Sequence, residues 1–373
     1  MEDSRKILYV VDYLPDIPNS VGNILNAVLN NVSALKVKQI IVQRPELYFS
    51  SIQKRYVNGF LAYTGENITK FDKLKSKVMK RIKKTDNSQQ TEIDYFQSLI
   101  DIEKPDFIIF LIFNPEKHLA KICKDNGIKN YWMLYDTFVS RPGLDITDAV
   151  SIEETAMKES LGYYVPSFFY DDYRKYYCCD KLKSYNLPLL IPKNDVVDAF
   201  NKHEDAYEYT YFGQVQSFRN ADKIKELCRK IHVKIDVFTT DDLESDDVFV
   251  VHKALSGEQL YQVAAHSKYL IVFDNGKPYE NYLPSKVFLY VSFTKPVIAF
   301  GDNKDSALLR FFKSYPCFFY QDFNESFSGL VDFLNENVSS SFDQNIYDSY
   351  NQYLPETALD QFVGNLKEEL KGN

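Results

Sequence analysis

The chain alternates apolar strand patterns with helical patterns along its whole length, and this alternation limits the fold more than any single motif. The first apolar run, KILYVVDYL, spans residues 6–14 and is followed by a turn and a helical pattern over residues 20–32. A continuous apolar run is typical of a parallel strand that is buried on both faces. The alternation therefore predicts a parallel sheet wrapped by helices.

The same pattern continues to the end of the chain, with one interruption. In the first half, strands are expected over residues 37–43, 106–113, 130–136, 162–167 and 187–192, and helices over 116–126 and 152–160. The polar stretch 201–209 is interpreted as a linker. After it, strands are expected over 209–213, 234–240, 248–255, 269–275, 297–300 and 317–322, and helices over 221–231 and 257–266.

This organisation predicts an α/β chain of two Rossmann-like domains in tandem with an interdomain cleft. The expected parts are a first domain over 1–200, a second over 201–355, and a C-terminal helix within 356–373 that packs back on the first domain. A length of 373 residues fits two domains.

Composition excludes several classes of protein. The net charge of −8 argues against a nucleic-acid binder, and the five cysteines have neither metal-ligand spacing nor an even number for disulfides. No apolar run reaches the length of a membrane span. No metal or other cofactor is indicated, because the five histidines are dispersed. A cytoplasmic protein is expected, with any membrane contact peripheral.

The segment ENYLPSKVFLYVSFTKPVIAFG, residues 280–301, carries the most informative motif. Lys286 stands at the start of an apolar helical pattern, directly after Ser285. A cation is slightly disfavoured there unless an anion binds beside it. We expect Lys286 to pair with the diphosphate of a nucleotide and Ser285 to cap the helix or contact a phosphate. A solvated lysine on a helix end is the alternative.

Other candidate nucleotide-binding residues flank this motif. In YTYFGQVQSFRN, Gly213 ends a strand and Arg219 follows six positions later, so both can approach a phosphate, or can belong to an ordinary strand-to-helix loop. Glu280 and Tyr282 lie in the loop before Lys286, where they can contact sugar or ribose hydroxyls.

Two residues of the first domain are candidates for a ligand-binding site at the end of its sheet. Asp136 ends the strand of residues 130–136, where ligands of α/β sheets gather, and can act as a base or position an acceptor hydroxyl. A helix-capping aspartate is the equal alternative. Gly22 lies after the first strand, where the backbone of such folds approaches a ligand, or it can simply begin a helix.

A basic amphipathic pattern, KFDKLKSKVMKRIKK, spans residues 70–84. Its apolar residues recur on one helical stripe, and its cations cover the remaining surface. Such a helix suits an anionic membrane surface, or packs its stripe on the first domain with the cations in solvent. The membrane-facing candidates are Lys73, Lys77, Lys80, Arg81 and Lys84.

These motifs together resemble the GT-B glycosyltransferases. The segment YLPSKVFLYVSFTKPVIAFG is similar to their Pro-x-Lys … Tyr … Lys-Pro-Val-Ile signature, and LSGEQLYQVAAHSKYLIVFDN to the helix and strand that precede it. IEETAMKESLGYYVPS resembles the glutamate-rich helix and strand near the end of the acceptor domain. In these motifs the chain also resembles bacterial family-four transferases and the glucosyl- and galactofuranosyltransferases of surface glycans.

The resemblance implies a metal-independent, retaining hexosyltransferase. It would move a sugar from a nucleotide-diphosphate donor, most simply a UDP-sugar, to a glycan, glycolipid or glycoprotein acceptor at the inner face of the cell membrane. A homo-oligomer is compatible with it. The sequence departs from the family at Leu289, where many members have a ribose-binding glutamate, and at Tyr135, where related transferases have a histidine. These departures favour an alternative, a non-catalytic glycosyltransferase-like subunit that binds glycan or stabilises a partner. A nucleotide-sugar epimerase of the same architecture is a second alternative.

Overall fold

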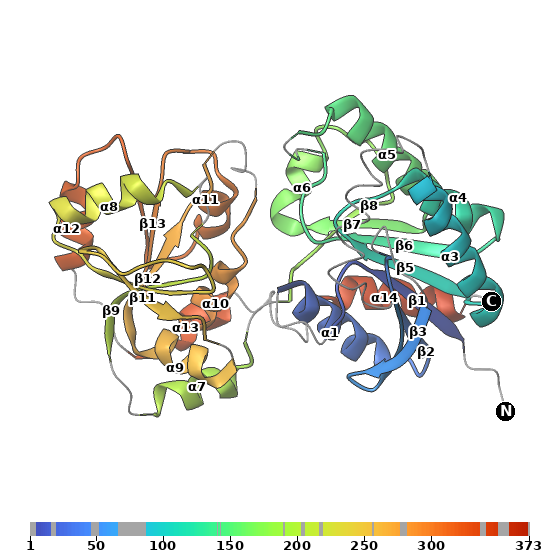
Figure 1. Cartoon of the computed structure of the whole chain (residues 1–373), viewed down its shortest axis with the longest axis horizontal. Coiled ribbons are helices and arrows are strands. Elements are labelled where there is room, and N and C mark those ends of the chain that lie inside the picture. The colour runs from blue at the N-terminus through green and yellow to red at the C-terminus, as the bar shows by residue number, and fades with distance from the viewer. Residues whose placement is uncertain are drawn as a thin grey trace. The chain divides into compact units, whose positions relative to one another are not determined.

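The computed structural model describes residues 5–15, 20–45, 52–65, 87–139, 141, 143–188, 191–202, 206–215, 219–255, 257–276, 282–335, 341–349 and 358–371. The chain divides into two compact units (Figure 1). Unit 1 consists of Met1–Leu187 together with Leu359–Asn373, and unit 2 consists of Pro188–Ala358. Each unit is described separately below.

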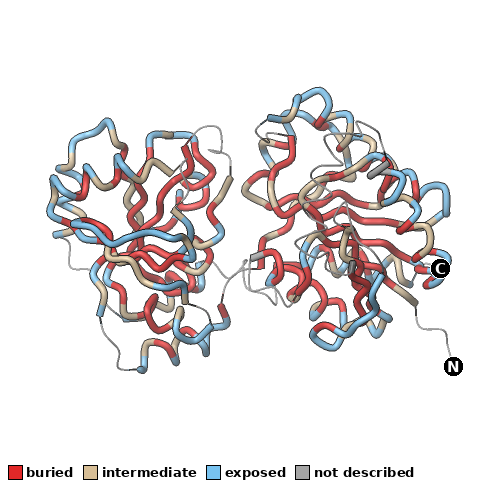
Figure 2. Tube along the Cα trace, viewed as in Figure 1, coloured by how far each residue is buried: buried red, intermediate tan, exposed pale blue. Residues whose placement is uncertain are grey.

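Unit 1 is built on an eight-stranded sheet of order β3-β4-β2-β1-β5-β6-β7-β8. Its strands are parallel except β3, which pairs with β4 in the antiparallel sense. The bounds are β1 Lys6–Val11, β2 Lys38–Gln43, β3 Ile52–Val57, β4 Phe60–Gly65, β5 Phe107–Ile112, β6 Lys129–Leu134, β7 Gly162–Pro166 and β8 Leu182–Tyr185. The apolar runs of the sequence form the central strands, which are buried along their length (Figure 2).

Helices cover both faces of this sheet. α1 (Ser20–Ser33) and α14 (Asp360–Lys371) lie on one face, and α3 (Asn87–Glu103), α4 (Lys117–Asp125) and α5 (Ile146–Lys158) lie on the other (Figure 1). The short α6 (Ser167–Tyr173) follows β7. Alternate residues of β7 reach the two faces: the Tyr163 hydroxyl bonds Glu153 of α5, and the Tyr164 ring contacts Phe362 of α14.

Unit 2 is built on a six-stranded sheet of order β11-β10-β9-β12-β13-β14, and its strands are parallel. Their bounds are β9 Tyr207–Phe212, β10 Ile235–Thr239, β11 Phe249–Lys253, β12 Ser267–Phe273, β13 Val297–Gly301 and β14 Phe318–Asp322. The helices are α7 Lys193–Phe200, α8 Ala221–Lys230, α9 Gly257–His266, α10 Lys286–Ser292, α11 Ala307–Phe312, α12 Ser328–Asn335 and α13 Gln344–Ser349. Apolar residues of α8 and α12 pack on one face of the sheet to form its core.

Two sequence expectations about this architecture are confirmed, namely two parallel-dominated α/β sheets and a C-terminal helix. The helix α14 packs on unit 1: the Phe362 ring meets the rings of Tyr131 and Tyr164, and the Asn365 side-chain amide donates to the Tyr164 hydroxyl at 2.6 Å. Its burial in unit 1 explains why the two ends of the chain belong to the same unit.

Two details of the expected boundaries are wrong. The chain passes from unit 1 to unit 2 at Leu187–Pro188 rather than after residue 200, because α7 packs on α9 and so belongs to unit 2. The strand expected over 187–192 is absent from the described residues of that range. Pro188 and Pro192 remove the amide donors that a central strand needs.

Candidate functional site

The carboxyl ends of the parallel strands in unit 2 bring several sequence-predicted residues together. Gly213 directly follows β9, and Asp274 directly follows β12. Lys286 begins α10, the helix that leads from β12 to β13. Ligands of open α/β sheets bind at this edge, since the loops there can vary while the strands hold them in place.

The ammonium group of Lys286 is buried at this edge without a hydrogen bond. Its Nζ atom lies 3.5 Å from the centre of the Tyr211 ring, and a Cβ placed on Gly213 would lie only 3.1 Å from Nζ. The described part of the chain offers Nζ no hydrogen-bond partner. Burial, and then the nearby charge of Arg219, hold the pKa of Lys286 well below its usual range, while Asp241 acts in the opposite direction.

Arg219 contacts the hydroxyl group of the same tyrosine, Tyr211. One guanidinium nitrogen donates to the Tyr211 hydroxyl at 2.6 Å and to the Gln214 carbonyl at 3.0 Å. The Tyr211 ring itself stacks on Phe273 with centroids 4.0 Å apart. Tyr211 therefore holds two cations, Lys286 over its face and Arg219 at its hydroxyl, beside the glycine that ends β9. Gly213 has φ +114°, a conformation that favours glycine.

A second cluster of polar side chains lies at the carboxyl ends of β12 and β13. Asp274 is buried and accepts hydrogen bonds from the Tyr320 hydroxyl at 3.1 Å and from the Asn275 amide at 2.9 Å. Burial raises the pKa of Asp274 to about 6. The Asn275 side-chain amide donates to the Tyr282 carbonyl at 2.7 Å, whereas its Oδ1 atom is buried without a partner in the described chain. Asn275 is thus an acceptor prepared for a hydroxyl or N–H group.

The other residues that the sequence predicts to contact the nucleotide or its sugar are Tyr282, Ser285 and Glu280. Tyr282 contributes its backbone carbonyl to Asn275. Ser285 precedes α10 but makes no capping hydrogen bond, so the expected cap is wrong. Its backbone is already helical, and this directs the hydroxyl away from the free amides of the first turn. Glu280 lies outside the described residues, as do Lys73, Lys77, Lys80, Arg81 and Lys84.

The carboxyl edge of the unit 1 sheet carries Asp12 after β1 and Asp136 after β6. Asp136 Oδ1 accepts a hydrogen bond from the Thr137 amide at 2.8 Å, and burial raises the pKa of Asp136 to about 8. Tyr135 is buried, and its hydroxyl has no partner among the described residues. Gly22 lies in the first turn of α1, not in the loop before it, and is buried there.

Asp12 is anchored in a polar network at the same edge. Its Oδ2 atom accepts from the Phe113 amide at 2.7 Å, and its Oδ1 atom lies 3.4 Å from an Arg44 nitrogen. Arg44 Nε also donates to Glu92 at 2.9 Å, and Glu92 in turn contacts His118 at 2.6 Å. Burial raises the pKa of Asp12, and the Arg44 charge opposes that rise.

Sequence reasoning missed Asp12, Asn275 and Asp241. The first two follow a buried strand directly or one residue later, a position that could have indicated them. Asp241 lies in the acidic run of residues 241–247, and its carboxylate accepts a hydrogen bond from the Val215 amide at 2.6 Å. The carboxylate thereby holds the backbone of Val215, two residues after Gly213.

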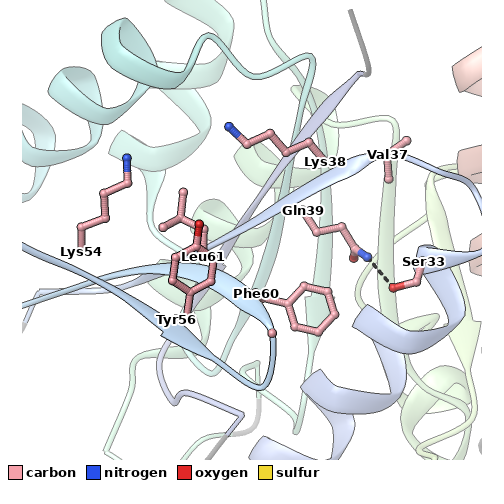
Figure 3. Close-up of a pocket in the computed structure, with 9 residues that line it drawn as sticks. Ser33, Val37, Lys38, Gln39, Lys54, Tyr56, Phe60 and Leu61 are labelled. Atoms are coloured by element: carbon pink, nitrogen blue, oxygen red, sulfur yellow. Dashed lines mark hydrogen bonds between the residues drawn. The ribbon is translucent and has the colours of Figure 1, made fainter.

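A pocket of about 450 Å³ lies at the opposite edge of the unit 1 sheet (Figure 3). It is lined by the starts of β2 and β4 and by β3, and Gln39 in its wall donates to Ser33 at 2.9 Å. Because Asp12 and Asp136 are at the carboxyl ends of the strands, this pocket is separate from them. Within the described ranges, no group of three or more His, Cys, Asp or Glu side chains could hold a metal ion, and no helix is both long and apolar enough to cross a bilayer.

Comparisons with known proteins show the fold. No protein-family model and no curated protein matches the sequence. Solved structures similar to this chain include sucrose-phosphate synthase from Thermosynechococcus elongatus, with TM-score 0.66, 10% identity and coverage of 98% of this chain and 99% of that chain. A glycosyltransferase from Rickettsia africae gives TM-score 0.65 at 11% identity, covering 100% of both chains.

The UDP-GlcNAc 2-epimerase from Methanocaldococcus jannaschii is also similar, with TM-score 0.57, 10% identity and coverage of 97% of this chain and 99% of that chain. The chain therefore has the GT-B fold, the architecture that the sequence predicts. At these identities the likeness concerns the fold, and the chemistry must be argued from the site.

Proposed function

We propose that the protein is a glycosyltransferase that takes a sugar from a nucleoside diphosphate donor, with a UDP-sugar as the first candidate. The observation that carries this proposal is the buried, unpartnered Nζ atom of Lys286 beside the cation of Arg219. Two cations brought together in a buried site repel each other unless an anion binds between them. A diphosphate supplies the charge and the acceptor oxygens that Lys286 lacks.

The same arrangement suits transfer chemistry. When the glycosidic bond to the diphosphate breaks, negative charge develops on the leaving oxygen. Lys286 and Arg219 are placed to stabilise that charge. The unpartnered Asn275 Oδ1 at the end of β12 is an acceptor for a hydroxyl of the donor.

Unit 1 is proposed to bind the acceptor, a glycan, glycolipid or glycoprotein, at the edge that carries Asp136. With its pKa raised to about 8, Asp136 is largely protonated at neutral pH and donates a hydrogen bond, and it becomes a base as the pH rises. No metal has a role in this scheme, and a retaining outcome is proposed from the resemblance alone. A bacterial surface glycan made at the inner face of the membrane would be a suitable product.

Thermal stabilisation by UDP, GDP, CMP and NAD, followed by donor hydrolysis and transfer assays, tests the proposal. A shift with UDP that is lost in Lys286→Met supports a UDP-sugar donor. Conversion of a UDP-sugar to its epimer without an acceptor would instead identify an epimerase. Absence of any nucleotide shift would favour the non-catalytic subunit and overturn the proposal.

A further inference from the structure

A carboxylate without solvent contact lies at the centre of a tyrosine cluster in unit 1. Glu153 of α5 is 0% exposed. Its Oε1 atom accepts hydrogen bonds from the hydroxyls of Tyr163 at 2.6 Å and Tyr173 at 2.9 Å, and its Oε2 atom accepts one from Tyr177. Burying a carboxylate costs free energy unless the carboxylate is hydrogen-bonded. The three hydroxyl donors around Glu153 compensate for its burial.

One of these tyrosines also contacts the loop that carries Asp136. The Tyr173 hydroxyl accepts a hydrogen bond from the Phe138 amide at 2.9 Å. Phe138 follows Asp136 by two residues, and the intervening Thr137 amide donates to Asp136 Oδ1 at 2.8 Å. A continuous chain of hydrogen bonds and backbone therefore leads from Glu153 through Tyr173 to the loop and its aspartate.

The single hydrogen of the Tyr173 hydroxyl fixes the direction of the two hydrogen bonds that this group makes. A tyrosine hydroxyl has one hydrogen to donate and two lone pairs. Because Tyr173 gives its hydrogen to Glu153, a lone pair is left to accept the Phe138 amide. If the carboxyl did not accept that hydrogen, the hydroxyl could rotate, and the buried amide of Phe138 would lose its partner.

We propose that Glu153 is a positioning residue for Asp136 and acts through the Tyr173 hydroxyl. The proposal rests on the proposed function only in assigning Asp136 to the acceptor side. Glu153 itself touches no substrate. Its effect is to keep the loop after β6 in one conformation, so that the Asp136 carboxyl is held in a fixed direction.

The surroundings of Glu153 make this positioning sensitive to pH. Burial raises the pKa of Glu153 to about 7, and the hydrogen bonds from the tyrosines oppose the rise. The titratable groups that face the cluster are Tyr163 of β7, Tyr173 of α6, Tyr176 and Tyr177 after α6, and Glu154 of α5. An ionised carboxyl accepts more strongly than a neutral one, so the loop is held more firmly as the pH rises through neutrality.

A matched pair of variants tests the proposal. Tyr173→Phe and Tyr163→Phe each remove one hydroxyl from the same Oε1 atom, but among the described residues it is the Tyr173 hydroxyl that accepts the Phe138 amide. The Asp136 carboxyl is followed by carbon-13 NMR during a pH titration, with Asp136→Asn to assign its signal. We expect Tyr173→Phe to change the apparent pKa of Asp136 and the exchange of the Phe138 amide, and Tyr163→Phe to leave both near their wild-type values.

Activity gives a second readout. In a transfer assay, Tyr173→Phe should lower kcat on the order of 10- to 100-fold, since misplacing a reacting group by about 1 Å can cost on the order of 100-fold. UDP-induced stabilisation, which reports on unit 2, should be unchanged in both variants. Glu153→Gln keeps an acceptor oxygen, so it should preserve most of the activity and leave the titration of Asp136 near pH 8 as the remaining pH response.

The failures of the two proposals are distinguishable. If UDP stabilises no form of the protein, the proposed function fails, yet the Asp136 titration still decides the positioning role. An unchanged Asp136 titration in Tyr173→Phe, or equal changes in both tyrosine variants, would overturn the role of Glu153 while leaving the nucleotide site intact.

Discussion

The Nζ atom of Lys286 lies 3.5 Å from the centre of the Tyr211 ring, although the two residues belong to different elements of unit 2. The ring gives the cation an electrostatic partner but no hydrogen-bond acceptor. The ligand-free protein therefore holds a buried amino group in an unfavourable environment. Strained or unsatisfied groups of this kind cluster at functional sites, where a ligand relieves them.

Replacing this lysine should make the ligand-free protein more stable. Because burial lowers the pKa of Lys286, the folded state binds its proton less well than the unfolded state does, and this lowers stability below the usual lysine pKa. Lys286→Met should raise the free energy of unfolding by on the order of 1–3 kcal/mol and abolish stabilisation by UDP. Urea unfolding with and without UDP measures both effects.

Lys295 provides a matched control for this variant. It is also a buried lysine over an aromatic ring, 4.9 Å from the centre of Phe200, but it precedes β13 and so lies at the amino edge of the sheet. Lys295→Met should leave UDP binding unchanged. If both variants lost UDP binding, the loss would reflect a general effect on unit 2. The assignment of Lys286 to the nucleotide site would then be wrong.

Nucleotide binding should be coupled to proton uptake. Lys286 has a lowered pKa in the free protein, and a bound diphosphate should raise that pKa again. Between the two values, binding takes up a proton, so UDP affinity should fall as the pH rises through that window. Calorimetry in buffers of different ionisation enthalpy measures the uptake directly. UDP binding by the wild type without proton uptake anywhere in that window would contradict the assignment.

The carboxyl of Glu153 should make stability depend on pH. Its pKa is about 7 in the folded protein, against an ordinary value near 4.5, so the folded state keeps a proton that the unfolded state loses. This contribution is fully present below about pH 4.5 and is lost as the pH rises through about 7, up to about 3 kcal/mol in all. Glu153→Gln should flatten that part of the profile, and an unaltered slope would refute the assignment.

Gly301 should not accept a side chain. A Cβ at this position would lie 2.9 Å from the Asp274 Cβ atom and would overlap the Tyr320 hydroxyl, which bonds Asp274. Gly301→Ala should destabilise the protein by about 1–3 kcal/mol and weaken nucleotide binding. Thermal unfolding and UDP titration test both effects.

Gly364 of α14 provides a control for Gly301, because a Cβ added at Gly364 would meet no atom within 4 Å. Gly364→Ala should stabilise the protein by about 0.5–1 kcal/mol, because alanine loses less backbone freedom in a helix. If both alanine variants destabilised the protein to the same degree, close packing at the ends of β12 and β13 would not explain the effect at Gly301.

The basic segment of residues 70–84 should bind anionic vesicles if it contacts a membrane. Each cation near such a surface contributes about 1 kcal/mol. Replacing five of them by glutamine should abolish co-sedimentation with phosphatidylserine vesicles; the changed positions are Lys73, Lys77, Lys80, Arg81 and Lys84. Binding to neutral and anionic vesicles alike, or to neither, would refute the membrane role.

Much of the architecture could be predicted because parallel strands that are buried on both faces appear as continuous apolar runs. The β3–β4 hairpin was missed because β3, IQKRYV, is an exposed, charged edge strand without such a run. Its turn does carry a signal: Asn58 and Gly59 have φ of 49° and 85°, as a two-residue hairpin turn of this sequence requires. The signal of a turn is therefore independent of the hydrophobicity of its strands.

The candidate site could be predicted only in part. The spacing of Gly213, Arg219 and Lys286 relative to strands indicated that they share one edge, and in the structure they lie around one ring. That ring, Tyr211, was not a candidate, and neither was Asn275. Whether a polar atom lacks a partner depends on packing between distant segments, and no local pattern in one sequence records it.

The placement of α14 has a consequence for how the chain is made. Unit 1 holds both chain ends, and unit 2 is inserted between β8 and α14. Segments of a nascent chain become available in the order of synthesis. Unit 2 is thus complete before unit 1, whose sheet leaves Tyr131 and Tyr164 uncovered until Phe362 arrives. The first unit therefore acquires the contacts of Phe362 only after all of unit 2 has been synthesised.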